Sequence, residues 1–415
     1  MATLFLGPYR TVLREPAFRR FWLGFTFSIL GDSMTRVALT WHVYETTRSP
    51  AALGWLALCY TGPVAISGFL AASLLDRLDR RAVMVADCLL RGAVMTAIPV
   101  LHATGLLALW HVYAAAAVWG ALMMLTLAGT PALLPALVPR EQLATANALE
   151  TLSYTVVGVI GPPLAGLLAP RVGAPNLLLV DACSYLVFAW ALVAARPPRE
   201  AAGSRPGRAA SSFGDVARLL AGHPVLVSTT LMFMAWNVGY GALHVWLPVV
   251  AAQVLGGGAG LYGALLGAFA AGEVASALLA GSLAQRWPLG TLICRAQALS
   301  GLALAPLAVA PAVATGFVGL AACGAASAPL TIWAQTLRMR ILPEDMRGRA
   351  FAILRTIMQG GAPLGGLAAG LLLPHVDVRL VMLVSVALTG LPGLIGARVR
   401  ALREAGSPEE APRPA

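Results

Sequence analysis

Acidic and basic side chains inside long apolar segments are the residues of this chain best suited to do chemistry. On insertion scales a charge within a membrane span costs about 2.5–3.5 kcal/mol, so each one needs a partner or a task. The apolar segments contain such charges at Asp32, Arg36, Asp87, Arg91, Glu150, Asp181, Glu273, Arg295 and Arg355. The chemistry open to them is proton uptake or the binding of a charged ligand.

Two pairs of opposite charge have the spacing of neighbours on one helix face. Asp32 and Arg36 are four residues apart, which places them one above the other. They either neutralise each other or form a site where Asp32 takes up a proton and Arg36 favours its charged form. Asp87 and Arg91 repeat the spacing. For them we expect a structural role with the charged loop that precedes them.

The remaining acids are less paired. Glu273 has no basic residue within one helical turn, so it is either a proton carrier or a partner of Arg295 or Arg355 on another helix. Glu150 and Asp181 lie early in their segments, where a helix N-terminus favours an anion. The proton-coupling candidates are therefore Asp32 and Glu273, with Arg36 beside the first.

Composition identifies the chain as a multi-pass membrane protein. It has 415 residues, 58% hydrophobic and 11% charged, whereas a soluble domain carries about 25% charged residues. The net charge of +11 comes from arginines in short loops between apolar segments, a pattern that membrane orientation requires. We therefore expect no nucleic-acid partner.

Several functional classes are excluded by residue usage. All 29 basic residues are arginine, which excludes a P-loop and a Schiff-base lysine. The five cysteines and six histidines are scattered, without the spacing of a metal site or a disulfide framework. We expect no metal, no cofactor and no enzymatic activity.

The hydropathy pattern predicts an all-α fold of twelve transmembrane helices in two six-helix bundles. The spans are expected at 21–44, 51–75, 82–102, 108–130, 145–169, 175–195, 224–247, 259–282, 289–310, 312–335, 350–373 and 377–397. The corresponding parts are an N-terminal lead (1–20), a bundle (21–195), a linker (196–223), a second bundle (224–397) and a tail (398–415). The linker is rich in Arg, Pro, Gly and Ser, so we expect it to be flexible.

The arginines orient these spans. Only Arg48, Arg171 and Arg379 fall in the expected outer loops, so lead, linker and tail are expected in the cytoplasm. The halves also repeat: Pro139–Pro170 aligns without gaps on Pro343–Pro374. Parallel six-span repeats are typical of one large transporter fold.

At this point the sequence resembles the major facilitator superfamily. The family's loop between spans 2 and 3 matches Ala72–Arg81 in its acidic and basic positions, with Ala72 and Asp79 where the family has glycines. Span 5 carries a motif similar to that of drug/proton antiporters, formed by Gly158, Gly161, Pro162 and Gly166. Leu30–Asp32 and Leu342–Arg349 resemble the bacterial macrolide-efflux and enterobactin-exporter branch. The arginine that many drug/proton antiporters carry in span 4 is missing.

The resemblance implies roles for further residues. A cytoplasmic gate would be formed by Asp76, Arg77, Asp79, Arg80, Arg81, Asp87 and Arg91. Spans 1, 4, 7 and 10 line the family's cavity. The substrate-cavity candidates, from spans 1, 7, 10 and 11, are Asp32, Arg36, Trp236, Asn237, Trp333, Gln335, Met358 and Gln359.

The function implied is export of an amphipathic, drug-like small molecule from the bacterial cytoplasm, by proton antiport with alternating access. The partners would be the substrate, protons and the lipid bilayer, and we expect a monomer. The alternatives are a siderophore or metabolite exporter, an importer, a lipid flippase or a transporter-like sensor.

Overall fold

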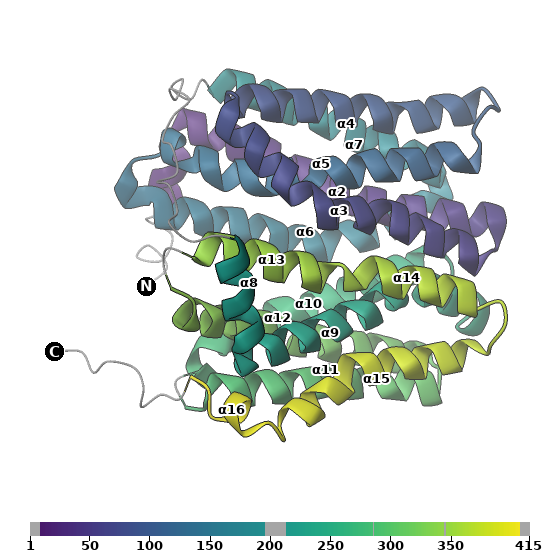
Figure 1. The fold of residues 1–415 in the computed structure, drawn as a ribbon. Coiled ribbons are helices and arrows are strands. Elements are labelled where there is room, and N and C mark those ends of the chain that lie inside the picture. The colour runs from purple at the N-terminus through teal and green to yellow at the C-terminus, as the bar shows by residue number, and fades with distance from the viewer. Residues whose placement is uncertain (1–8, 196–212, 285, 344–345, 407–415) are drawn as a thin grey trace. The chain divides into compact units, whose positions relative to one another are not determined.

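The computed structural model describes residues 9–195, 213–284, 286–343 and 346–406, and these ranges contain helices and no strand (Figure 1). The earlier helices are α2 (Pro16–Thr47), α3 (Pro50–Arg77), α4 (Arg80–Ala103), α5 (Leu109–Leu137), the short η1 (Arg140–Gln142), α6 (Leu143–Val172) and α7 (Ala174–Ala195). The later ones are α8 (Phe213–Gly222), α9 (Pro224–Val249), η2 (Val250–Val254), α10 (Ala259–Ala284), α11 (Leu289–Val309), α12 (Val313–Ile341), α13 (Arg347–Gln359), α14 (Gly361–Leu372), α15 (Val378–Gly396) and α16 (Arg400–Arg403).

Ten helical segments of the described chain are long and apolar enough to cross a membrane. Every expected span coincides with a helix, but two do not meet this test. The span expected at 21–44 is α2, a continuous helix of 32 residues that contains Asp32 and Arg36. The span expected at 350–373 is divided at Gly360 into α13 and α14. Two charges within α2 and a break between α13 and α14 thus distinguish the two exceptions.

The chain forms two compact units, Met1–Thr46 with Gly62–Arg205 and Thr47–Thr61 with Pro206–Ala415. In the first unit α4 packs along both α7 and α5. Helix α2 approaches α7 closely because it presents glycine at the contact. A methyl group added at Gly24 would lie 2.6 Å from the Ala191 Cβ, and one added at Gly31 would lie 2.9 Å from the Asp181 Cα.

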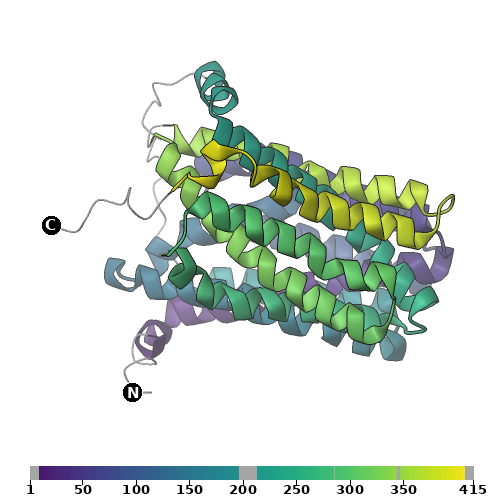
Figure 2. The ribbon, with the colours of Figure 1, turned by 90° about the horizontal axis from the view of Figure 1, so that it is seen from below.

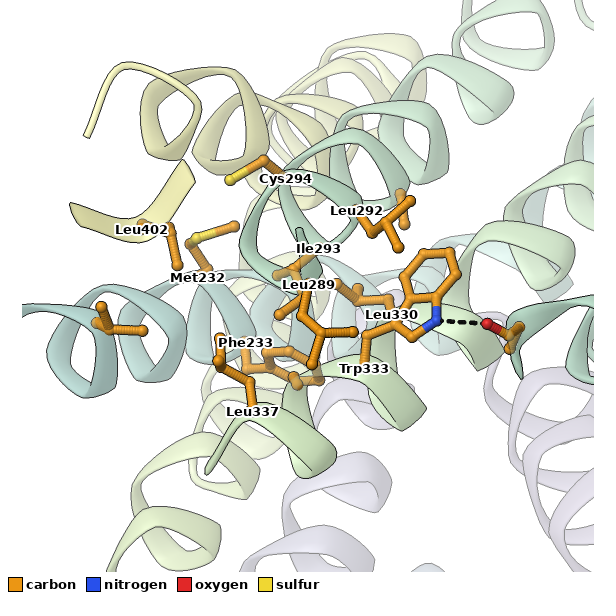
Figure 3. Close-up of a cluster of buried hydrophobic side chains, with 14 residues drawn as sticks. Met232, Phe233, Leu289, Leu292, Ile293, Cys294, Leu330, Trp333, Leu337 and Leu402 are labelled. Carbon is orange, nitrogen blue, oxygen red and sulfur yellow. Dashed lines mark hydrogen bonds between the residues drawn. The ribbon is translucent and has the colours of Figure 1, made fainter. Parts of the chain in front are cut away.

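The second unit is built around an apolar core between α9, α11 and α12 (Figure 3). Phe233, Ile293 and Leu337 are buried there. Helices α15 and α16 (yellow) lie alongside α11 in both ribbon views (Figures 1 and 2). Where the helix ends face water, burial of this apolar surface stabilises the fold by about 25 cal/mol per Å² removed from water. Within the bilayer the close packing itself holds the helices together.

Two segments outside the expected spans are helical. The linker was expected to run from 196 to 223, but its last part is α8, because Val216 and Leu220 are buried against Leu342 and Leu354. The beginning of the tail also packs. The backbone N–H groups of Leu289 and Gly290, at the first turn of α11, donate to carbonyls of Gly406 and Ala405, which satisfies donors that a helix start leaves unpaired. Residues 196–212 lie outside the described part of the chain.

The two units repeat one packing contact. In the second unit Gly239 of α9 lies against Ser385 and Thr389 of α15, as Gly31 of α2 lies against Asp181 of α7. The first and last spans of each half therefore meet at a glycine. Polar side chains face that glycine in both units.

We expect Gly31→Ala to lower the free energy of unfolding by about 1–3 kcal/mol, the usual cost of overpacking, because the new methyl group would contact the backbone of α7. The matched control is Gly68→Ala in α3, where an added Cβ meets nothing within 4 Å. Thermal unfolding of the purified protein in detergent measures both. Equal midpoints for the two variants would contradict the close contact.

Candidate functional site

A buried ion pair between Arg91 and Asp87 of α4 is the centre of a polar network in the first unit. The Arg91 Nε donates to Asp87 Oδ1 at 3.1 Å, and its Nη2 donates to Asp87 Oδ2 as well. Thr126 of α5 accepts from Arg91 and donates to Asp87 Oδ2 at 3.1 Å. The side chains of Arg91 and Asp87 are 1% and 0% exposed, so each charge depends on the other for its stability.

Asp32 of α2 joins this network from its edge. Its Oδ1 lies 3.5 Å from the Arg91 Nη1 and accepts hydrogen bonds from the Trp119 indole, at 2.8 Å, and from the Tyr185 hydroxyl. Tyr185 in turn accepts from Arg91 and Trp119 and lies under the guanidinium, 4.5 Å from ring centroid to Cζ. The Asp32 side chain is 18% exposed. It is the most accessible carboxylate of the network.

A third acid, Asp181, lies on α7 one helical turn before Tyr185. Asp181 is fully buried, and its Oδ2 accepts from the Thr35 hydroxyl at 2.6 Å while its Oδ1 accepts from Ser184 at 3.2 Å. Both donors are neutral. Asp181 and Tyr185 are four residues apart, which puts them on one face of α7. The glycine at position 31 lets α2 bring Asp32 and Thr35 against that face.

The structure adds contacts to two expected pairs. Asp32 also faces Arg91 on α4, and Arg36 is half-buried. Asp87 and Arg91 contact Asp32, Thr126 and Tyr185 within the bundle, and their role in the cytoplasmic gate stays a prediction. The i, i+4 spacing correctly indicated that Asp87 and Arg91 pair. It could not show which other helices face them.

The network also contains residues that sequence reasoning missed: Thr35, Trp119, Thr126, Ser184 and Tyr185. Trp119 lies in the span without charges, so it was not considered. A polar aromatic side chain in the middle of an apolar span normally finds a hydrogen-bond partner when buried. From the sequence, that rule would have indicated Trp119 and Tyr185 as members of a polar network.

The charged loop residues have local structural roles. The Asp79 carboxylate accepts from the backbone N–H of Ala82 at 2.7 Å and caps the start of α4, which explains an acid where the family has glycine. Arg81 and Arg20 donate to the carbonyls of Val193 and Ala194 in the last turn of α7, at 2.5 and 3.1 Å.

These bonds satisfy carbonyls that a helix end leaves unpaired. Arg77 is exposed, Arg80 is half-buried, and the side chain of Asp76 lies outside the described part of the structure. The gate function of the five loop residues, Asp76, Arg77, Asp79, Arg80 and Arg81, stays a prediction.

The glycine-rich motif of α6 makes a close contact with α2. A methyl group added at Gly161 would lie 2.7 Å from the Ser33 Cβ, in agreement with the expectation that small residues let these helices approach. Pro162 and Gly166 are buried and Gly158 is half-buried. Helix α6 remains one continuous helix through Pro162.

Glu273 of α10 has a partner of a kind that was not expected. Its Oε1 accepts from the Ser327 hydroxyl of α12 at 2.8 Å, and no described basic residue forms an ion pair with it. Arg295 instead lies over the exposed Trp287 ring at 4.7 Å, and Arg355 is exposed. Glu273 is half-buried. Glu150 of α6 is also half-buried.

Of the expected cavity residues in the second unit, some pack against neighbouring helices and the others are half-buried or exposed. Trp333 is in the apolar core, 5% exposed, with its indole donating to the Ala280 carbonyl at 2.8 Å (Figure 3). Helix α12 turns Trp333 toward α10, and its assignment to the cavity stays a prediction. Met358 packs against two apolar clusters, and Asn237 lies against Gly361 of α14 with its amide bonded to its own helix.

Trp236 keeps a half-buried ring, Gln359 is half-buried and Gln335 is exposed.

The site combines a buried ion pair, Arg91 with Asp87, and a partly exposed carboxylate, Asp32, at its edge. The described residues contain no group of His, Cys, Asp and Glu that could hold a metal ion.

Comparisons with known proteins agree on one family. A family model described as a transmembrane secretion effector matches residues 8–414. An MFS-type transporter, y4rN of Sinorhizobium fredii, is 32% identical over 375 residues, covering 88% of this chain and 90% of that protein. The enterobactin exporter EntS of Citrobacter koseri is 30% identical over 374 residues, 86% of each chain.

Solved structures share the fold. A mutant of the nucleoside transporter NupG matches with a TM-score of 0.78 at 11% identity, covering 92% of this chain and 100% of that one. A bacterial homologue of the iron transporter ferroportin matches with a TM-score of 0.64 at 19% identity, covering 91% and 98%.

We expect Arg91→Gln to lower the free energy of unfolding by about 3–5 kcal/mol, because it leaves the buried Asp87 without a counter-ion. Adding Asp87→Asn should restore part of that loss, since the double variant buries no charge at the pair. Thermal unfolding in detergent is the measurement, with the exposed Arg77→Gln as control. A single variant as stable as its control would show that the pair does not hold the bundle together.

Proposed function

The chain belongs to the transmembrane secretion effector family of major facilitator transporters, and from that premise we propose that it exports an amphipathic, drug-like small molecule across the cytoplasmic membrane in exchange for protons. The observation that carries the proposal is Asp32, a partly exposed carboxylate at the edge of a buried charge network. Alternating access in such transporters arises from two helical bundles that move around a midplane site.

The coupling follows from the contacts of Asp32. In its charged form it accepts from Tyr185 and Trp119 and faces Arg91. Hydrogen bonds to a charged group are worth about 1.5–3 kcal/mol, against 0.5–1.5 kcal/mol for neutral pairs. Proton uptake at Asp32 therefore weakens the contacts between α2 and the helices of Trp119, Tyr185 and Arg91 by a few kcal/mol.

A change of a few kcal/mol supplies a large part of what a two-state transporter needs, because moving a population from 1:99 to 99:1 takes about 5.5 kcal/mol of differential stabilisation. Arg91 keeps Asp87 as its counter-ion throughout, so the network loses one contact and does not lose its core. Glu273 is the second candidate for coupling, and Arg36, four residues after Asp32 on α2, is a candidate to act on Asp32 or on the cargo.

The relatives favour a second candidate function. Proteins named enterobactin exporters are 29–30% identical to this chain over nearly its whole length. Dedicated export of a siderophore or metabolite uses the same fold and the same coupling network. It differs in the cargo, which would be one compound class.

The test of coupling uses everted membrane vesicles with an imposed proton gradient and a panel of amphipathic drugs and catecholate siderophores. We expect addition of the cargo to release protons from the wild-type vesicles, and Asp32→Asn to abolish this release while leaving the protein folded. Glu150→Gln is the control, because it removes a half-buried carboxyl outside the network. Proton release by Asp32→Asn at the wild-type rate would contradict Asp32 as the coupling acid. A response to siderophores alone would favour the second function.

A further inference from the structure

Helix α11 has one face that no described part of the chain covers. Ile293, Gln297 and Ser300 are fully buried and mark its inner face. Leu299 and Leu302 are 56% and 66% exposed, and from the helical period they point about 160° away from the buried set. With 21 residues, α11 is just long enough to cross the hydrocarbon core. Its outer face therefore meets lipid chains, and its first turns lie near the headgroups.

Arg295 is a charged residue on this lipid-facing side. It is exposed and precedes Leu299 by four residues and Leu302 by seven, so it points within about 40° of both. Its Cζ lies 4.7 Å from the centroid of the Trp287 ring, and Trp287 precedes the first residue of α11 by two positions. The guanidinium thus extends toward the start of the helix. Arginines on a lipid-facing surface reach the headgroups in this way.

Helix α16 brings a second arginine to the same end of α11 (Figure 1). The Thr291 hydroxyl, one helical turn before Arg295, donates to the Arg403 carbonyl at 2.8 Å. The contact between the two backbones is close, because a Cβ added at Gly290 would overlap the Leu402 carbonyl. The Arg403 side chain is exposed. The position of α16 is therefore fixed next to the face that carries Arg295.

This end of α11 carries positive charge that the described chain does not neutralise. Arg286, in the turn before α11, is exposed as well. The acid next to Arg403 in the sequence, Glu404, pairs with Arg400 at 3.0 Å. No acid of the described residues forms an ion pair with Arg286, Arg295 or Arg403. Each guanidinium has five N–H donors, so donors remain for an external anion.

We propose that this end of α11 binds an anionic phospholipid of the phosphatidylglycerol type. Its phosphate is held by Arg295 and Arg403, since guanidinium groups bind phosphate through paired hydrogen bonds. One acyl chain lies along Leu299 and Leu302. The Trp287 ring, 44% exposed, holds the Arg295 guanidinium at headgroup level, where tryptophan is enriched. A zwitterionic lipid keeps the apolar contact and loses the attraction between net charges.

The lipid joins two elements of the second unit. Arg295 belongs to α11 and Arg403 to α16, so one headgroup bound to both holds α16 against the start of α11. This partner does not depend on which compound the protein exports or on proton coupling.

The test compares phosphatidylglycerol with phosphatidylcholine of the same acyl chains. Each lipid is titrated into the full chain in neutral detergent, and the bound lipid is counted by native mass spectrometry. We expect the wild type to bind phosphatidylglycerol at least about tenfold more tightly than phosphatidylcholine and to unfold at a higher temperature in its presence. Glycerophosphoglycerol, the headgroup without its chains, should bind at least about tenfold more weakly than the lipid.

Single variants separate the contributions. Arg295→Gln and Arg403→Gln should each weaken phosphatidylglycerol binding about fivefold, the effect of one arginine near an anionic surface. Trp287→Leu should weaken it about two- to fivefold, the range of an exposed cation–π contact. All three should bind phosphatidylcholine as the wild type does and keep its unfolding midpoint without lipid.

The matched control is Arg379→Gln, which removes an exposed arginine from the first turn of α15. The other end of α15 meets α11, where Gly393 lies against Cys294 and Ala298. The control should therefore leave phosphatidylglycerol binding unchanged.

Three results would overturn the assignment. The first is equal affinity of the wild type for the two lipids. The second is a loss in Arg295→Gln and Arg403→Gln no larger than the loss in Arg379→Gln. The third is binding of glycerophosphoglycerol as tight as binding of the lipid, which would show a site for free anions.

Discussion

The buried pair of Arg91 and Asp87 is the interaction on which the first unit depends. A guanidinium that is 1% exposed cannot be sheltered by apolar neighbours, so it requires a counter-ion and further hydrogen-bond acceptors. Asp87 supplies the charge, Thr126 and Tyr185 supply oxygens, and Asp32 closes the network from α2. Four helices are thereby fixed relative to one another. Asp32 is the more exposed carboxylate, with 18% of its side chain accessible, which is why we propose it as the coupling acid.

The second unit repeats the scaffold with different chemistry. Where α2 meets α7 at Gly31, the facing side chains are Asp181 and Ser184; where α9 meets α15 at Gly239, they are Ser385 and Thr389. Ser385 accepts from the buried Trp246 indole at 3.1 Å, so a neutral bond replaces a charged one. The first unit thus places a carboxylate at this contact, and the second places neutral hydroxyls there.

The described arginines serve in several ways, and burial separates them. Arg91 is an internal counter-ion, Arg81 and Arg20 cap the end of α7, and Arg77 is exposed. Position in the sequence suggested a cytoplasmic charge for Arg20, Arg77 and Arg81. The guanidinium can reach carbonyls a full turn away, so arginines that orient a helix in the membrane also complete its last turn.

The sequence by itself determined the membrane class and the approximate position of each expected helix, because long apolar segments bounded by arginine have one stable form in a bilayer. It also determined that Asp87 pairs with Arg91, since four residues make one helical turn. The tertiary structure decided which helices meet. It placed Arg91 beside Asp32, brought Trp119 and Tyr185 to both, turned Trp333 into the core and made a helix of residues 213–222. The helical period fixes each side chain's direction around its own axis, and only packing fixes what lies opposite.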